Sequence, residues 1–118
     1  MRKHTLTYEP FDIVVVPFPF TASAQTRRRP ALVLSQHSNF GNKIGHSVLA
    51  MITSRKNAPW PLDCEIMSKK ESGLTAPSVV RMNLFTLDNR FIITKIGHLS
   101  DSDQEKIKQS LSQIFDYL

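Results

Sequence analysis

The sequence predicts a small, mainly β protein that closes with an α-helix. Short apolar runs alternate with Pro, Gly, Asn and Ser along most of the chain, a rhythm typical of antiparallel strands joined by turns. Residues 100–118 instead place their apolar side chains at helical spacing. The length of 118 residues is that of one domain, so we expect residues 1–118 to form a single domain, with a flexible or short segment at residues 1–10.

The expected strands follow one another between loops. Residues 12–18 are rich in β-branched side chains, although Pro17 confines pairing there to an edge or to the end of the strand. Gly97 predicts a bulge or a close approach of another segment. We expect strands at residues 12–18, 31–35, 47–53, 62–67, 78–85 and 91–99, and loops at residues 21–30, 37–45, 54–61 and 68–77.

The final segment has the signals of a helix start. Ser100 is a favourable N-cap, and Asp103 occupies the N3 position of a capping-box-like pair. One helical face then carries the apolar side chains of Ile107, Leu111, Ile114, Phe115 and Leu118. A helix with one apolar face is expected to pack back on the antiparallel sheet.

The basic residues are unevenly distributed. The chain has 15 Lys and Arg against 10 Asp and Glu, a formal net charge of +5. Residues 1–60 hold 8 of the basic and only 2 of the acidic side chains. This imbalance favours a polyanionic partner, either nucleic acid or an acidic protein segment, although a plainly solvated surface would have the same charge.

Several classes of protein are disfavoured. Cys64 is the single cysteine, so neither an intrachain disulfide nor a Cys-rich zinc site is expected, and we interpret Cys64 as a small core filler. The four histidines are scattered, which argues against a metal site. No cofactor motif occurs. The apolar run near residue 14 is too short for a signal peptide or a membrane span, so we expect a cytoplasmic protein without a membrane partner.

A few polar residues at strand ends could carry chemistry. Arg29 precedes Pro30 at the entry to a strand, and Thr53 and Ser54 end another. Arg81 falls on the polar face of a mostly buried strand, where it needs either a salt bridge to a carboxylate or a ligand. Trp60 stands between two prolines in a basic loop and is either a packing residue or a platform for a base.

Five blocks carry a resemblance to a known family. DIVVVPFPFT, RRRPALVLS, MITSR, PSVVRMNLFTLD and IGHLS occur in this order, from about residue 11 to the C-terminus. Together they resemble the PemK/MazF family of bacterial toxins. The resemblance implies an SH3-like barrel of the CcdB, MazF and Kid type with about six to seven antiparallel strands and a C-terminal helix. It also implies a homodimer.

The resemblance further implies the toxin of a type II toxin–antitoxin system. Such toxins are sequence-selective, metal-independent endoribonucleases that cleave single-stranded mRNA without a cofactor. A cognate antitoxin with an acidic tail neutralises them, and the complex binds DNA. The family's catalytic arginine, strand-end hydroxyl and second arginine correspond to Arg29, Thr53 and Arg81. The expected RNA-binding residues are Gln25, Arg27, Arg28, Ser54, Arg55, Lys56, Trp60 and Asn83.

The chain departs from the Kid-like pattern at the general base. Where Kid-like members have an aspartate, this chain has Asn83, which is not a useful proton acceptor, and the first loop has no histidine. Asp63 and Asp88 are possible substitutes without a spacing argument, and Asp88 is more typical of a turn cap beside Asn89. Two alternatives therefore stay open, namely a CcdB-like gyrase inhibitor and a catalytically silent relative that binds RNA and antitoxin.

Overall fold

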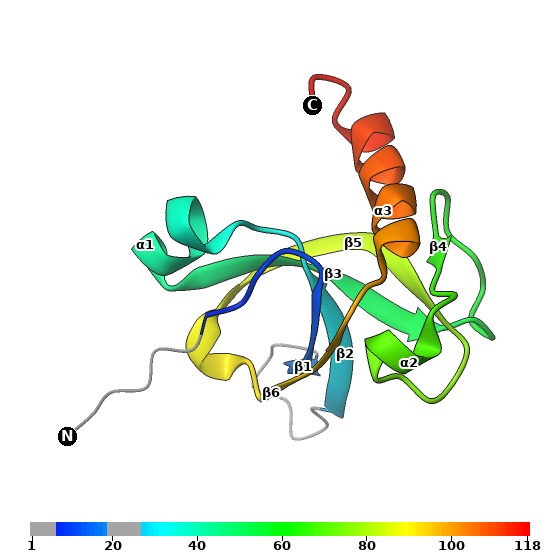
Figure 1. Cartoon of the computed structure of the whole chain (residues 1–118), viewed down its shortest axis with the longest axis horizontal. Helices are drawn as coiled ribbons and strands as arrows, with labels where there is room; N and C mark the ends of the chain where they lie inside the picture. The colour runs from blue at the N-terminus through cyan, green and yellow to red at the C-terminus, as the bar shows by residue number, and fades with distance from the viewer. Residues whose placement is uncertain (1–6, 19–26) are drawn as a thin grey trace.

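A computed structural model describes residues 7–18 and 27–118 of the chain (Figure 1). Its strands are β1 (Asp12–Phe18), β2 (Arg27–Val33), β3 (His46–Ser54), β4 (Cys64–Glu65), β5 (Ser78–Asp88) and β6 (Thr94–His98). The helical elements are the π-helix η1 (His37–Gly41), α1 (Asn42–Ile44), α2 (Lys69–Ser72), the 3₁₀-helix η2 (Asn89–Phe91) and α3 (Asp101–Ile114). Within these residues, no helix is long and apolar enough to cross a membrane.

The strands form one curled, half-barrel sheet in the order β4-β5-β3-β2-β1-β6, and each of these neighbouring strands pairs with the next in the antiparallel sense. Figure 1 shows α3 standing on one side of the sheet and rising away from it towards the C-terminus. The expected fold class, mainly β with a C-terminal helix, is therefore confirmed.

The central strands are buried on both faces of the sheet. Neighbouring side chains such as Ile13 and Val14 point to opposite faces, and both are fully buried. One cluster includes Ile13, Leu32, Ile52 and Val80 and extends to Ile107 of α3. The other includes Val14, Val16, Val33 and Leu49 and is covered by Tyr8 and Ile92. The sheet is thus a rigid support for side chains at the strand ends.

The predicted start of the final helix is confirmed, but its predicted extent is wrong. The Ser100 side chain accepts a hydrogen bond from the Asp103 backbone N–H at 3.2 Å, as an N-cap does. The helix ends at Ile114, and Phe115 is its C-cap. Of the predicted apolar face, Ile107 is buried, whereas Ile114 and Leu118 are exposed.

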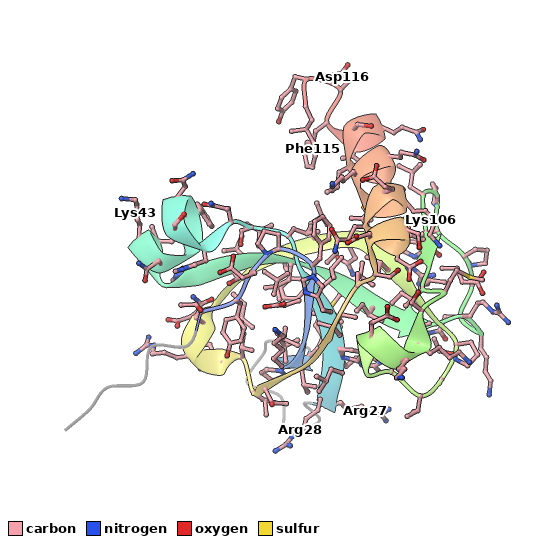
Figure 2. All side chains as sticks on the ribbon, viewed as in Figure 1. Arg27, Arg28, Lys43, Lys106, Phe115 and Asp116 are labelled. Carbon is pink, nitrogen blue, oxygen red and sulfur yellow. The ribbon has the colours of Figure 1, made fainter. Side chains whose placement is uncertain are left out.

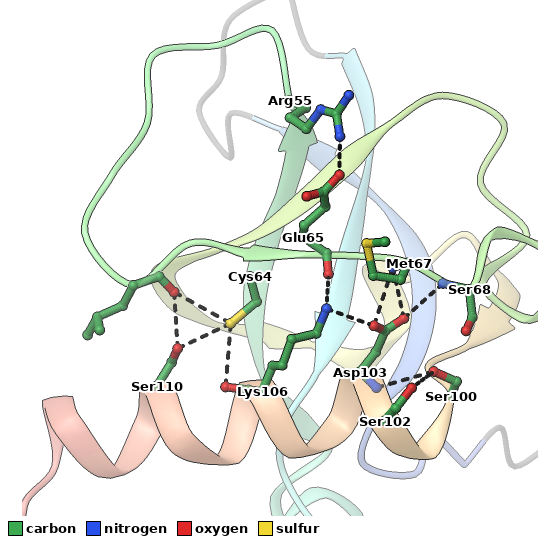
Figure 3. A network of polar contacts seen from close by, with 11 residues as sticks. Arg55, Cys64, Glu65, Met67, Ser68, Ser100, Ser102, Asp103, Lys106 and Ser110 are labelled. Carbon is green, nitrogen blue, oxygen red and sulfur yellow. Dashed lines mark hydrogen bonds and ion pairs between the residues drawn. The ribbon is translucent and has the colours of Figure 1, made fainter.

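Several polar contacts attach α3 to the segment around β4 (Figure 3). The buried Asp103 carboxylate accepts hydrogen bonds from the backbone N–H groups of Met67 and Ser68, both at 3.1 Å from Oδ2. These bonds and Lys106 lower the pKa of Asp103 against the opposing effect of burial, which is the largest single influence. Cys64 is buried with its Sγ 3.1 Å from the Ser110 hydroxyl, in agreement with its interpretation as a core residue.

Several element boundaries differ from those predicted. Strand β2 begins four residues before the expected start, because Arg27–Arg29 pair with Val16–Phe18 of β1, so the arginines lie on a strand rather than in a loop. The expected loop at residues 37–45 is helical, and α2 lies in the expected loop at residues 68–77. The fourth and sixth strands are shorter than predicted, at Cys64–Glu65 and Thr94–His98.

Gly97 has both of the features that the sequence predicted. The β1–β6 register shifts beside it, between Ile13 and Val14. The backbone of α2 also approaches so closely that a Cβ atom on Gly97 would lie 2.1 Å from the Ser72 carbonyl oxygen. Gly73, with a φ of 74°, completes this contact from the other side by packing against Ile96. Only glycine fits at these positions.

Candidate active site

A small pocket lies where β1, β3 and β5 meet the first residues of β2. Its volume is about 120 Å³, and its lining combines apolar and polar side chains. The lining residues are Phe18, Arg29, Met51, Ile52, Thr53, Trp60, Arg81 and Asn83. All three residues expected to be catalytic, Arg29, Thr53 and Arg81, are among them.

Antiparallel pairing brings Arg29 and Thr53 together. Strands β2 and β3 pair Ala31 with Met51, and Arg29 and Thr53, each two residues from this pair, both line the pocket. On its other side, Arg29 pairs with Val16 of β1, which fixes its backbone. The arginine is half-buried, and its position on a paired strand limits the directions in which its guanidinium can point.

A bulge in β5 brings Arg81 and Asn83 to the same pocket. The pairing of β3 with β5 shifts between Ala50, opposite Leu84, and Ile52, opposite Val80. Three β5 residues, 81–83, therefore lie opposite Met51 alone. Alternate residues of a strand share a side, so Arg81 and Asn83 both line the pocket. Bulges of this kind are frequent beside active sites because they re-aim side chains.

Arg81 is held by the loop between β3 and β4. Its side chain is 11% exposed and forms a two-pronged ion pair with Asp63, with Nε 3.2 Å from Oδ1 and Nη2 2.9 Å from Oδ2. Nη2 also donates to the Ala58 carbonyl oxygen at 2.8 Å. The salt bridge that the sequence left as an alternative for Arg81 is therefore present, and the arginine lines the pocket as well.

The ion pair fixes the charge state of both partners. Burial alone would raise the pKa of Asp63, but hydrogen bonds from Arg81 and from the Trp60 backbone N–H lower it on balance. The hydrogen bond to Asp63 raises the pKa of Arg81 above its already high normal value. Near neutral pH the carboxylate is therefore ionised and the guanidinium carries its full positive charge.

Thr53 and Trp60 complete the polar side of the pocket. The Thr53 hydroxyl accepts a hydrogen bond from the Asn57 amide at 2.5 Å, which leaves its own hydrogen available to a ligand. Trp60 is 46% exposed, and the centroid of its ring lies 5.2 Å from Cζ of Arg81. This is the distance of a cation–π contact, so Trp60 both packs against Arg81 and remains open to solvent.

Apart from Trp60 and Asn83, the described residues expected to bind RNA do not line this pocket. Ser54, Arg55 and Lys56 line a second pocket of about 300 Å³ with Ala76 and Pro77. The Arg55 side chain is bound to Glu65, which offsets part of its charge (Figure 3). Arg27 and Arg28 are exposed at the start of β2, far from α3 and the C-terminus (Figure 2). Gln25 lies outside the described residues.

Sequence reasoning did not identify every residue of the site. The contact of Asn57 with Thr53 and the contact of Asp63 with Arg81 were not predicted. Asn57 follows Thr53 by four residues in a polar loop, and a strand and a helix separate Asp63 from Arg81, so the residue spacing indicated neither contact. Asp88, the other candidate base, is at the opposite end of β5, where it pairs with Arg90 and caps η2.

Within residues 7–18 and 27–118, no group of three or more His, Cys, Asp or Glu side chains could hold a metal ion.

The fold and the pocket together define a class of small protein. Its members have a curled antiparallel sheet and a C-terminal helix, and the sheet presents two arginines and a hydroxyl group in one pocket. The family model of PemK-like, MazF-like toxins of type II toxin–antitoxin systems matches residues 9–115. The chain therefore belongs to this family, as its sequence blocks predicted.

Solved structures support the same fold. MazF in a MazE–MazF complex from Deinococcus radiodurans is 19% identical, with a TM-score of 0.75 over 94% of this chain and 98% of that one. The Mycobacterium tuberculosis toxin MazF-mt6 is 20% identical, with a TM-score of 0.69 over 89% and 96%. A mycobacterial endoribonuclease in complex with its cognate antitoxin is 15% identical, with a TM-score of 0.69 over 95% and 96%. No match was found among curated protein sequences.

Proposed function

We propose that this toxin is an endoribonuclease that cleaves single-stranded mRNA by attack of a ribose 2′-hydroxyl on the adjacent phosphate, without a metal ion or cofactor. One observation carries the proposal: Arg29, Thr53 and Arg81 converge on a single pocket of about 120 Å³. Two guanidiniums and a hydroxyl are the donors that a phosphodiester requires. A structural relative named as an endoribonuclease supports the same assignment.

In the proposed reaction, the 2′-oxygen forms a bond to phosphorus while the bond to the leaving 5′-oxygen breaks. The 2′-hydroxyl loses its proton and the 5′-oxygen gains one, so the products are a 2′,3′-cyclic phosphate and a 5′-hydroxyl. Negative charge increases on the phosphate oxygens on the way, and Arg29 and Arg81 stabilise it there. The Thr53 hydroxyl donates to a phosphate oxygen and orients it.

In this proposal neither the arginines nor Asn83 transfers a proton. The pKa of Arg81 is raised by Asp63, so its guanidinium donates hydrogen bonds but is a poor formal acid. Asn83 lines the pocket as an amide and can bind a phosphate or a base edge. Among the described residues, no carboxylate or imidazole lines the pocket, and the contribution of the lining residues is charge stabilisation and orientation.

The remaining basic and aromatic residues are proposed to bind RNA on either side of the scissile phosphate. Ser54, Arg55 and Lys56 line the adjacent pocket of about 300 Å³ and would contact a neighbouring phosphate. The exposed face of Trp60 would stack on an unpaired base. Arg27 and Arg28 would add contacts from the start of β2, and Gln25, which lies outside the described residues, is proposed to bind RNA as well. Such binding weakens as salt is added, because phosphate contacts release counterions.

Two protein partners are proposed. The first is an antitoxin whose acidic tail competes with RNA for this basic surface in the cytoplasm, and relatives in MazE–MazF complexes support it. The second is another copy of the chain. An apolar groove of about 380 Å³ between α3 and the sheet, lined by Leu84, Leu111 and Phe115 among others, supports a homodimer there. Sedimentation equilibrium tests it: Phe115→Glu should give monomers, and Tyr117→Glu, outside the groove, should not.

The activity is tested by incubating the purified protein with single-stranded RNA in EDTA. Wild type and Lys43→Ala, which removes an exposed charge on α1, should cut the RNA, whereas Arg29→Ala should lose at least about tenfold in rate. Intact RNA across a broad range of sequences would overturn the proposal. Salt-dependent binding without any cutting would favour the silent relative, and inhibition of gyrase would favour the CcdB-like alternative.

A further inference from the structure

Asp63 has an unusual set of partners for a residue of a surface loop. Its side chain is 13% exposed, and both oxygens are occupied. Oδ1 accepts a hydrogen bond from Nε of Arg81, while Oδ2 accepts one from Nη2 of Arg81 and another, at 3.0 Å, from the backbone N–H of Trp60. The carboxylate thus joins the arginine and the tryptophan that both line the pocket.

The loop is shaped to present this carboxylate. Leu62, the residue before Asp63, has a φ of 67°, a left-handed conformation that is costly for a branched side chain. Its carbonyl oxygen accepts a hydrogen bond at 3.1 Å from the Ser110 hydroxyl of α3, which holds the bend in place. Residues 60–63 form a turn, since the Asp63 backbone N–H donates to the Trp60 carbonyl oxygen at 3.3 Å.

The ion pair determines which part of Arg81 is left for a ligand. Nε and Nη2 are committed to Asp63 and to the Ala58 carbonyl oxygen. Nη1 donates to no acceptor in the part of the chain that the structure describes, and no buried side-chain nitrogen or oxygen there lacks a hydrogen-bond partner. Nη1 is therefore accessible, on an arginine that lines the pocket.

We propose that Asp63 is a positioning residue of the toxin: its carboxylate clamps Arg81 and Trp60 so that Nη1 of Arg81 meets the phosphate and the indole face meets a base. This inference rests on the proposed RNA cleavage. Asp63 acts through Arg81 and Trp60 rather than on the RNA, because three donors already occupy its two oxygens. It also makes the loop between β3 and β4 part of the site.

The clamp is tested first without RNA. Trp60 is the only tryptophan, so tryptophan fluorescence, excited where tyrosine does not absorb, reports this loop alone. In Asp63→Asn, an amide nitrogen replaces one oxygen and faces a donor, so the clamp opens. We expect a shift of the Trp60 emission to longer wavelength and stronger quenching by acrylamide. Asp88→Asn is the matched control, because Asp88 forms the same two-pronged pair with Arg90 away from the pocket. Identical spectra for wild type and Asp63→Asn would overturn the clamp.

The role in cleavage is tested by a double-mutant cycle on RNA. Asp63→Asn should lower kcat by about tenfold, because Arg81 stabilises charge that develops only during the reaction, and the displaced Trp60 should appear separately as a higher KM. In an Arg81→Ala background the same change should not lower kcat further, since Asp63 affects charge stabilisation through Arg81. If circular dichroism shows that Arg81→Ala is unfolded, Arg81→Gln takes its place in the cycle. The control variant, Asp88→Asn, should cut RNA at the wild-type rate.

The outcomes separate the two proposals. If wild type cuts RNA but Asp63→Asn keeps its kcat, or if the losses of the two single variants multiply in the double variant, Asp63 does not position Arg81 for cleavage. If wild type does not cut RNA, the proposed activity fails and the positioning role in cleavage fails with it. In that case a changed Trp60 spectrum in Asp63→Asn still supports the clamp as a feature of the loop.

Discussion

Replacing Arg81 by alanine should destabilise the protein strongly as well as impair its activity. The change leaves the Asp63 carboxylate, 13% exposed, without its counter-charge. Removing one partner of a buried pair costs about 3–5 kcal/mol. Asp63 would keep the hydrogen bond from the Trp60 backbone, so we expect the lower end, about 3 kcal/mol, in the free energy of unfolding. For a domain of this size that is a loss of about 12 °C in Tm.

The loss should also depend on pH in a defined direction. In wild type the pKa of Asp63 lies below its usual value, so the stability from the ion pair is fully present above the unfolded-state pKa of about 3.9 and is lost as the pH falls through the folded-state pKa. In Arg81→Ala, burial without the arginine would raise the pKa of Asp63, and uptake of a proton would then relieve the buried charge. The difference between the two proteins should therefore shrink as the pH is lowered.

The measurement is urea unfolding at pH 7 and near pH 4, followed by far-ultraviolet circular dichroism because Trp60 itself touches Arg81. Arg90→Ala is the control, since its partner Asp88 belongs to an exposed pair and little change is expected. A loss in Arg81→Ala of less than about 1 kcal/mol at pH 7, or a loss that does not shrink at low pH, would refute the reasoning.

Three further predictions concern other parts of the fold. Thr53→Val, which keeps the shape but removes the hydroxyl, should slow RNA cleavage at least about tenfold, measured at saturating RNA. Asp103→Asn should lower the free energy of unfolding at neutral pH by about 2 kcal/mol, because Met67 and Ser68 lose a charged acceptor. Since the pKa of Asp103 is lowered in the fold, this difference is present above about pH 4 and should fade as the pH falls through the folded-state pKa; a constant difference would contradict it. Gly97→Ala should cost about 2–3 kcal/mol in urea unfolding, because its Cβ would meet the backbone of Ser72; wild-type stability would contradict the close approach.

The sequence predicted the fold class and most strands because the patterns behind them are local. β-Branched runs, the Ser100 cap and the Gly97 close approach are each recorded within a few residues, and all were confirmed. The helical turns at residues 37–44 were missed because HSNFGNKI has no apolar periodicity. The end of α3 was misplaced because the apolar spacing continues past Ile114, to Phe115 and Leu118, although the helix itself ends at Ile114.

The site was predictable only in part, for a similar reason. Arg29, Thr53 and Arg81 were found through the family's sequence blocks, and the pocket contains all three. The contact between Asp63 and Arg81 depends on a left-handed Leu62 and on a bulge in β5, neither of which has a sequence signal in leucine or in the VVRMNLF run. The distribution of Arg27–Arg29 along a strand, rather than in a loop, depends likewise on pairing with β1.

The most direct test of the proposed mechanism is cleavage in EDTA of two RNA oligonucleotides that differ by one atom. They share one cleavable sequence, but the second has a 2′-deoxy sugar on the 5′ side of the scissile phosphate. Attack by the 2′-hydroxyl predicts that the first is cut to a 2′,3′-cyclic phosphate and a 5′-hydroxyl and that the second stays intact. Equal cutting of both, or a 5′-phosphate on the product, would contradict the account.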